Sequence, residues 1–477
     1  MTRWLTLTCG AGLVACSLAP ELPDPQVAIP PAYRETSAQV SGDWQLAKPA
    51  DDIERGAWWA VFRDPALDAL MARATAENQN LQAALARVEQ TRAQVRVAKS
   101  GQLPRLDFGA GGARVQPSKI SLPPDSAVSG SDVAERYTTL NARIAASYEL
   151  DLFGRVRDNL QAARADLAAE RALFASLVLS LQSDVAETYF LVRAADEELA
   201  ILHATVKLRE EGVRLLQRRA DAGDISEFDL KRETADLEAA RADVHALERI
   251  RAQYEHALAV LCGQVPATFA LVPLKVTRNL PEIPAGVPST LLERRPDIAA
   301  AQRRMVAANA RIGIAKAAFY PILNLTADFG VESSSLGDLF KWSSRTWALG
   351  PIAGALLSLP IFDGGRNTAN LAASEASLDA EIARYRQTVL TAFGEVEDGL
   401  SGLRTLAAQT SALQAAITAA DEVYRIAEVR YAAGATSYLD VLDARRTQVR
   451  VKRLAAQVYG TRAVTTVGLI RALGGGW

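Results

Sequence analysis

The positions of proline limit the fold of this chain more than any other feature, because they leave four long stretches free of it. No proline lies between residues 65 and 104, 124 and 266, or 296 and 321, and none follows residue 360. A proline inside a helix costs about 3 kcal/mol, so these four windows are where long helices can form. In the last window apolar residues recur at helical spacing, namely Val389, Phe393, Val396, Leu400 and Leu403.

Two of the predicted helices are unusually long. The runs from Arg155 to Gly223 and from Gly365 to Gly434 would each extend about 100 Å at roughly 1.5 Å per residue. Helices of ordinary globular proteins average about a dozen residues. The excess length predicts a coiled coil or a barrel of helices, and a soluble coiled coil without a channel is the simplest alternative.

The chain also contains an internal two-fold repeat. Residues 218–232 read RRADAGDISEFDLKR and residues 430–446 read RYAAGATSYLDVLDARR. Three corresponding pairs are each 211 positions apart: Gly223 and Gly434, Ser226 and Ser437, Asp229 and Asp440. A constant offset indicates that the two stretches occupy equivalent places in two copies of one structural unit. We expect the first repeat at 58–262, a linker at 263–290 and the second repeat at 291–477.

Each of these stretches has the sequence of a turn between two helices. The glycine closes one helix, since glycine adopts the left-handed conformation at little cost. Ser226 and Ser437 cap the next helix, and Asp229 and Asp440 take the capping-box position, each cap contributing about 1 kcal/mol. Asp443 lies three residues beyond Asp440 on the same helix face and has no capping role, so it needs another explanation.

Between the predicted helices, four segments have the character of membrane strands. Residues 138–152 and 321–333 alternate between apolar and polar side chains, and 103–115 and 345–361 are weaker candidates. Each is long enough for the roughly 9–11 residues that cross a bilayer as a tilted strand. A half-exposed sheet in a soluble protein is the alternative.

Four strands cannot close a barrel by themselves. Lipid contains no water to satisfy unpaired backbone groups, so a membrane sheet cannot keep open edges. Several copies of the chain must therefore share one barrel, and these arguments alone do not choose between dimers and trimers. After the first residues the sequence contains no apolar run of about 20 residues, which argues against a membrane-spanning helix.

The first residues, MTRWLTLTCGAGLVAC, resemble an export signal, with Arg3 followed by a mostly apolar run. Leu13 to Cys16 resemble the acylation signal of bacterial lipoproteins. We therefore expect a signal peptide at 1–15, a lipid on Cys16 and an acylated extension at 16–57, the alternative being an ordinary signal cleaved nearby. Ser17 after the cysteine favours the outer membrane by analogy with such lipoproteins, and several acyl chains anchor stably.

Composition excludes several classes of function. The chain of 477 residues has a net charge of −2, which argues against nucleic acid as a partner. Only three histidines and three cysteines are present, without Cys-x-x-Cys or His-x-x-x-His spacing, so we expect no metal site and no cofactor. No nucleophile with a base and no phosphate loop can be assembled, so we do not expect an enzyme and assign no catalytic residue.

Several phrases resemble the signature of the TolC-type outer-membrane efflux factors, and most closely their lipoprotein (NodT/OprM-like) branch. They are LLERRPDIAAAQRRMVAANARIGIAKAAFYPILNLTADFG at 291–330, WWAVFRDPALDALMARATAENQNLQAALARV at 58–88, YELDLFGRVR at 148–157, SLPIFDGGR at 358–366 and ALGGGW at 472–477. The phrases follow the family's order and spacing across the mature chain.

The resemblance implies an α+β membrane protein with a long coiled-coil barrel of helices and four transmembrane strands per chain. It implies a homotrimer with a 12-stranded β-barrel in the outer membrane of a Gram-negative bacterium. The implied function is the outer-membrane channel of a tripartite efflux pump, with a periplasmic membrane-fusion adaptor and an inner-membrane pump of the RND type, or of the ABC or MFS type. Alternatives within the family are the port of a type I protein secretion system and a heavy-metal efflux channel.

The resemblance also assigns roles at the two turns. Asp440 and Asp443 match paired acids that narrow the tunnel at its periplasmic tip. Tyr431 and Asp229 are implied to form side-chain links that hold neighbouring coils shut. Thr436 stands where some members have arginine, so Arg430 or Arg445 would have to supply the partner.

Overall fold

The computed structural model describes residues 17–27, 33–35, 56–116, 136–274, 280–281, 294–350 and 355–475. The expected signal peptide and Cys16 lie outside these residues. The chain divides into two compact units. Unit 1 comprises Met1–Pro25, Glu89–Ala169 and Gln302–Arg384, and unit 2 comprises Gln26–Val88, Glu170–Ala301 and Tyr385–Trp477.

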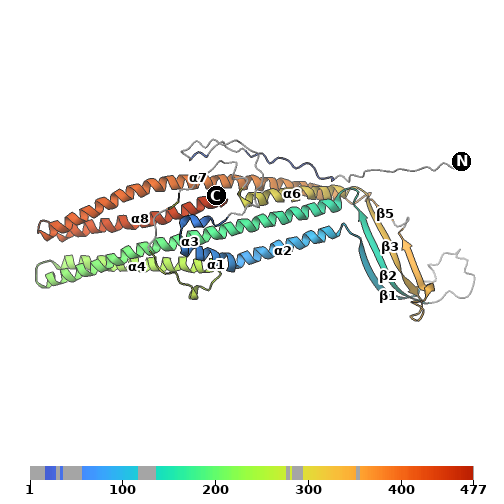
Figure 1. The fold of residues 1–477 in the computed structure, drawn as a ribbon, viewed down its shortest axis with the longest axis horizontal. Coiled ribbons are helices and arrows are strands. Elements are labelled where there is room, and N and C mark those ends of the chain that lie inside the picture. Colours follow the sequence, from blue (N-terminus) through green and yellow to red (C-terminus); the bar gives the residue numbers. More distant parts are fainter. Residues whose placement is uncertain are drawn as a thin grey trace, which may run out of the picture. The chain divides into compact units, whose positions relative to one another are not determined.

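The predicted long helices are confirmed. Helices α3 (Arg155–Asp221) and α7 (Arg366–Ala432) contain 67 residues each, and each is followed by a helix of 35 residues, α4 (Glu227–Leu261) or α8 (Tyr438–Ala472) (Figure 1). The shorter helices are α1 (Pro65–Glu77), α2 (Gln79–Ser100) and α6 (Pro296–Ala317). Short 3₁₀ turns occur at Trp58–Phe62, Pro266–Thr268 and Trp342–Ser344.

Unit 1 contains one antiparallel sheet. Its strands are β1 (Arg105–Val115), β2 (Tyr137–Leu150), β3 (Ile322–Ser333), β4 (Arg345–Leu349) and β5 (Ala355–Ser358). The order is β1-β2-β3-β4, and β5 also pairs with β3. β4 pairs with residues 327–331 of β3 and β5 pairs with residues 322–325. Along residues 327–331 of β3 the sheet is therefore four strands wide.

One strand prediction needs correction. Residues 345–361 were expected to form a single strand, but the described part of this run holds two short strands. The pairing moves from Leu349 opposite Ala327 to Ala355 opposite Leu325, so extra residues lie between the two strands. The sequence between them contains Pro351, and a proline has no N–H to donate to a neighbouring strand. The other three strands lie within the expected ranges, β2 and β3 where alternation placed them and β1 in one of the weaker candidates.

The sheet has one apolar face and one polar face. A row of paired residues runs straight across it: Phe108, Ile144, Phe329 and Trp347. Their exposed fractions are 73%, 50%, 57% and 71%, so none of the residues that the structure describes covers this apolar row. The next positions along the strands, including Asp107, Arg143 and Asp328, fall on the opposite face because side chains alternate. This two-sidedness is what a membrane sheet requires.

Unit 2 has its main core where α1, α3, α4 and α8 meet. Tyr189, Leu258, Cys262 and Ile470 are buried together there. Trp58 closes this core and donates a hydrogen bond of 3.1 Å from Nε1 to Gln182. None of the helices in the described part of the chain has a stretch long and apolar enough to cross a membrane.

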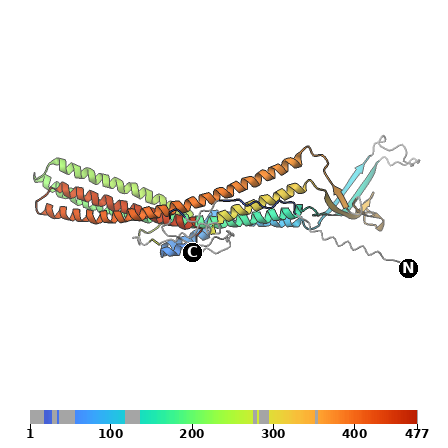
Figure 2. The same ribbon diagram turned by 90° about the horizontal axis from the view of Figure 1, so that it is seen from above.

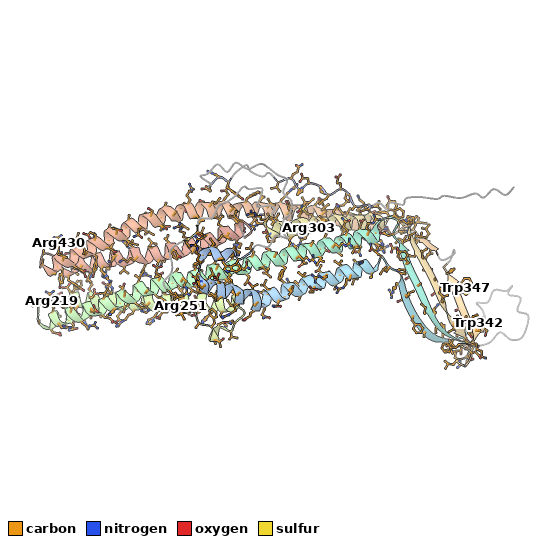
Figure 3. The ribbon with its side chains drawn as sticks, in the orientation of Figure 1. Arg219, Arg251, Arg303, Trp342, Trp347 and Arg430 are labelled. Atoms are coloured by element: carbon orange, nitrogen blue, oxygen red, sulfur yellow. The ribbon has the colours of Figure 1, made fainter. Side chains whose placement is uncertain are left out.

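A buried polar network in unit 2 holds the start of the linker between the repeats. Asp196 accepts from Arg193 at 3.1 Å and from Arg251 at 2.6 Å. The same two arginines donate to the backbone oxygens of Val272 and Leu271, at 2.6 and 2.7 Å (Figure 3 labels Arg251). Because hydrogen bonds involving charged groups are stronger than neutral ones, the linker is fixed to α3 and α4 at this point.

Candidate functional site

The two predicted turns lie at the same end of unit 2 in both Figures 1 and 2. Gly223 and Gly434 have φ values of +79° and +70°, the left-handed conformation that closes a helix. The N–H of the residue after each glycine donates back five positions, from Asp224 to the Arg219 oxygen and from Ala435 to the Arg430 oxygen, at 2.8 Å in both. Both turns therefore end their long helix with the same motif.

The restarting helices are capped by the expected residues. The Asp229 N–H donates to the Ser226 hydroxyl at 3.4 Å, and that hydroxyl donates to the Asp229 carboxylate at 3.0 Å. In the second turn the N–H and the hydroxyl of Ser437 both donate to the Asp440 carboxylate at 3.1 Å. These are local contacts between residues three apart, which is why sequence alone could place them.

Asp440 accepts one further hydrogen bond. The Thr436 hydroxyl donates to Oδ2 of Asp440, the oxygen that also accepts from Ser437. The hydrogen bond from Thr436 and those from Ser437, with the charge of Arg430, hold the pKa of Asp440 below its ordinary 3.8. Asp440 is therefore an exposed carboxylate that remains ionised at ordinary pH.

Asp443 lies in a different environment from Asp440. Its side chain is 67% exposed and accepts a hydrogen bond of 3.3 Å from Arg446 on the next turn of α8. Arg446 also donates to Asp236 on α4. The charge of Asp443 is thus partly balanced by an arginine that is shared with another helix.

Tyr431 joins the two coils of the chain. Its hydroxyl accepts a hydrogen bond of 2.7 Å from Arg219 on α3, and its ring packs on Tyr438 with the centroids 5.3 Å apart. Figure 3 places Arg219 and Arg430 at the same end of unit 2. Asp229 stays within its own cap, and Arg445 lies over the ring of Tyr424 at 4.7 Å. The hydroxyl of Tyr431 is therefore bonded to Arg219, a partner that the sequence had not suggested.

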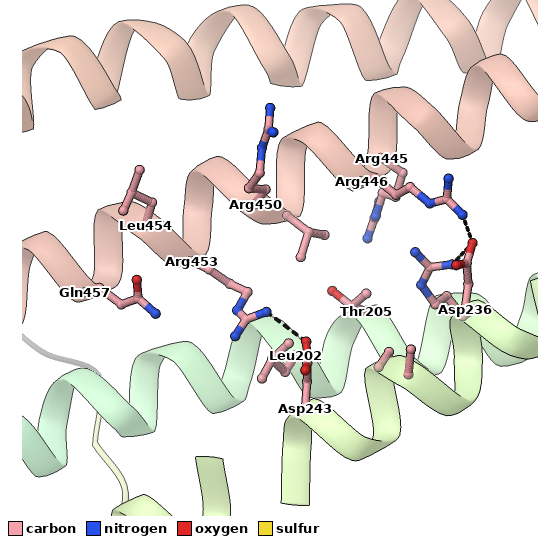
Figure 4. A pocket seen from close by; sticks show the side chains of 14 residues that line it. Leu202, Thr205, Asp236, Asp243, Arg445, Arg446, Arg450, Arg453, Leu454 and Gln457 are labelled. Atoms are coloured by element: carbon pink, nitrogen blue, oxygen red, sulfur yellow. Dashed lines mark hydrogen bonds and ion pairs between the residues drawn. The ribbon is translucent and has the colours of Figure 1, made fainter. Parts of the chain in front are cut away.

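Two ion pairs join α8 to α4 one heptad apart. Arg446 pairs with Asp236, and Arg453 pairs with Asp243 at 2.9 Å. Arg453 also donates to Glu198 on α3 at 3.0 Å. The side chains of the two ion pairs line a cleft of about 390 Å³ between the two coils, together with Arg209, Arg445 and Arg450 (Figure 4). The coils thus meet here through charged groups.

The start of α8 packs closely on α3. A Cβ on Gly212 would lie 2.7 Å from the Tyr438 hydroxyl, so a larger residue would push the ring away. Burial, with the nearby charge of Glu233, raises the pKa of Tyr438 to about 12. Because Tyr438 contacts Tyr431 as well, the ring of Tyr438 couples the α3 contact to the Arg219–Tyr431 hydrogen bond.

The turns carry the charged carboxylates of Asp440 and Asp443, and polar contacts join the two coils beside them. Among the described residues no three His, Cys, Asp or Glu side chains are placed so that they could hold a metal ion. The contacts that join the coils near the turns are hydrogen bonds and ion pairs, each of which contributes about 1 kcal/mol net. Such contacts can separate in water without exposing a large apolar core.

Comparison with known proteins identifies the chain. Residues 70–264 and 287–475 match the outer membrane efflux protein family. The outer membrane protein OprJ of Pseudomonas aeruginosa is 36% identical over 477 residues, which cover 99% of this chain and 95% of that protein. The probable efflux pump outer membrane protein TtgC of Pseudomonas putida is 34% identical over 476 residues, covering 98% and 93%.

A solved structure agrees with these matches. The open state of the MtrE outer membrane channel of Neisseria gonorrhoeae superposes with a TM-score of 0.80 at 32% identity, covering 97% of this chain and 98% of that one. The chain therefore belongs to the outer membrane efflux protein family and is an outer-membrane efflux channel.

Proposed function

We propose that three copies of this chain form an exit duct through which a tripartite pump expels apolar toxic compounds, such as antibiotics and solvents. The observation that carries this proposal is the sheet of unit 1. It is four strands wide, apolar on one face and polar on the other, and among the described residues the outer edges of β1 and of β4 have no partner strand.

Membrane physics makes such a sheet incomplete. Each unsatisfied backbone group in lipid costs several kcal/mol, so both edges must find partners. The smallest outer-membrane barrels have about eight strands, which exceeds what one copy provides. A trimer supplies twelve strands from the four-strand width of each copy, within the size range of known barrels.

The substrate class and partners are drawn from the relatives. Three relatives at 34% identity are named antibiotic, toluene and solvent efflux pump outer membrane proteins. We therefore assign small apolar compounds as cargo, an inner-membrane RND-type pump as their source, and a periplasmic adaptor that docks near residues 218–232 and 430–446.

The turns then act as the gate of the duct. The exposed carboxylates of Asp440 and Asp443, repeated in three copies, would form a ring that attracts cations and narrows the entrance. The Arg219–Tyr431 hydrogen bond would be the latch that keeps the two coils together in the closed state. Separation of this bond and of the ion pairs behind it would widen the entrance without unfolding either coil.

The cargo is tested in a Gram-negative strain that lacks its own efflux channel but expresses a matching adaptor and RND-type pump. Expression of this chain should restore resistance to toluene and to apolar antibiotics, measured as the minimal inhibitory concentration. Restoration of copper tolerance alone, or of protein secretion alone, would contradict the assigned cargo.

A further inference from the structure

The first residues that the structure describes are held firmly in unit 1. The Ser17 hydroxyl donates a hydrogen bond of 2.7 Å to Oδ1 of Asp158, in the first turn of α3. The Asn309 side-chain amide on α6 donates to the Pro20 carbonyl oxygen at 2.8 Å. Two helices far apart in the sequence therefore bind the same short segment, residues 17–20.

The place that receives this segment is closely fitted. Asp158 is 0% exposed. A Cβ on Gly313 would lie 2.1 Å from Oδ2 of Asp158 and 2.9 Å from the Ala19 nitrogen. Any side chain at position 313 would therefore displace the carboxylate, the segment, or both. Because Gly313 has no side chain, the Asp158 carboxylate and residues 17–20 can both pack against α6.

A structural role for Asp158 alone does not explain these contacts. An acid in the first turn of a helix is favourable because of the helix dipole, and such a residue can remain exposed. Burial of a carboxylate is costly unless hydrogen bonds compensate for the lost water. Burial raises the pKa of Asp158, and the hydrogen bond from Ser17 opposes that rise, as expected when Ser17 helps to stabilise the charged form.

We propose that Asp158, Asn309 and Gly313 form a receptor site for residues 17–20, the segment directly after Cys16, the residue expected to carry the lipid. Ser17 is covalently joined to Cys16, so a fixed Ser17 also fixes the root of the lipid anchor. The receptor lies where the sheet gives way to helices, since α3 begins at Arg155 shortly after β2 ends at Leu150. Ser17 then positions the lipid anchor, in addition to its expected role in directing the lipoprotein to the outer membrane. The docking does not depend on the proposed cargo or on the number of copies.

Hydrogen exchange read by mass spectrometry tests the receptor in the mature, acylated protein in detergent. The amides of Leu18 and Ala19 should be protected in the native protein. Asp158→Ala and Gly313→Ala should each release the segment and raise its exchange rate about tenfold or more. Asp158→Asn keeps an oxygen that can accept from Ser17, so it should retain most of the protection.

Matched controls separate the receptor from general loosening. Asp166 pairs with Arg311 at 2.6 Å and also links α3 to α6, so Asp166→Asn should leave the segment protected. Gly394, a helical glycine with open space around it, serves as the control for a glycine-to-alanine change.

The inference is overturned if residues 17–20 exchange freely in the native protein, or if Asp158→Ala leaves them protected. Equal loss of protection in Asp166→Asn would also overturn it, because any loosening of α3 and α6 would then suffice. Conductance is measured on the same samples. A protected segment in a protein that does not conduct would count against the channel and not against the receptor.

Discussion

Arg219 donates a 2.7 Å hydrogen bond to the hydroxyl of Tyr431, 212 positions later in the chain. The bond joins the last turn of α3 to the last turn of α7, next to the two glycines that end these helices. Along the helices it lies nearer to both turns than the ion pairs that also join the coils. Behind it the coils are joined by the ion pairs of Arg446 and Arg453. This order suggests that opening begins at Tyr431.

Tyr431→Phe should make the closed channel easier to open. The change removes one hydrogen bond, worth about 1 kcal/mol, while the ring contact with Tyr438 remains. We expect a larger open fraction or a higher mean conductance in planar-bilayer recordings. Tyr424→Phe is the control, because the Tyr424 hydroxyl bonds to Glu428 of its own helix and its ring lies beside Arg445 of α8, so these contacts stay within one coil. Equal effects of the two changes would argue against the latch.

Asp440→Asn should weaken blockade by trivalent cations more than Asp443→Asn does. The amide at 440 can still cap α8, so the change removes charge without removing the cap. Asp443 already shares its charge with Arg446, and its loss should matter less. Asp229→Asn changes the equivalent cap of the other turn and should leave blockade unchanged. If trivalent cations block all three variants as strongly as they block the native protein, neither Asp440 nor Asp443 belongs to the constriction.

Blockade should persist to low pH because of the contacts around Asp440. Its folded pKa is held below 3.8, so its charge, and with it the charged cap, is present above 3.8 and is lost as the pH falls through the lower folded value. In an Asp443→Asn background the midpoint of blockade against pH should therefore lie below 3.8. A midpoint at or above that value would show that the hydrogen bonds do not stabilise the ionised form.

Arg453→Met should destabilise the protein more than Arg446→Met. Without Arg453 the buried carboxylate of Glu198 loses its charged partner and keeps the hydrogen bonds from Gln457, which should cost about 1–3 kcal/mol. Without Arg446, Asp236 still has Arg209 at 3.4 Å, so the loss should be about 1 kcal/mol or less. Thermal unfolding in detergent checks the order, and a reversed order would contradict this account of the coil contacts.

The helices and most strands could be predicted because their signals are local. Proline-free windows and the glycines at positions 223 and 434 placed the ends of α3 and α7 within two residues. Alternation placed β2 and β3. The run at 345–361 was only a weak strand candidate, and its division into β4 and β5 was missed although Pro351 is a sequence signal against one continuous strand.

The site could be predicted only in part, for a similar reason. The caps at Ser226 and Ser437 involve residues three apart, which a sequence pattern reveals. The Arg219–Tyr431 bond depends on how α3 and α7 are rotated against each other, and local pattern does not fix that rotation. The ion pairs carried a usable signal: Asp236 and Asp243 are seven residues apart, as are Arg446 and Arg453, which is coiled-coil spacing.

The mass of the mature protein in detergent, determined together with its conductance, tests the central claim most directly. Native mass spectrometry should give a homotrimer, and the same preparation should form ion-conducting channels in planar bilayers. A monomer that stays soluble without detergent and does not conduct would contradict the claim that copies of this chain complete one another's sheet in the outer membrane.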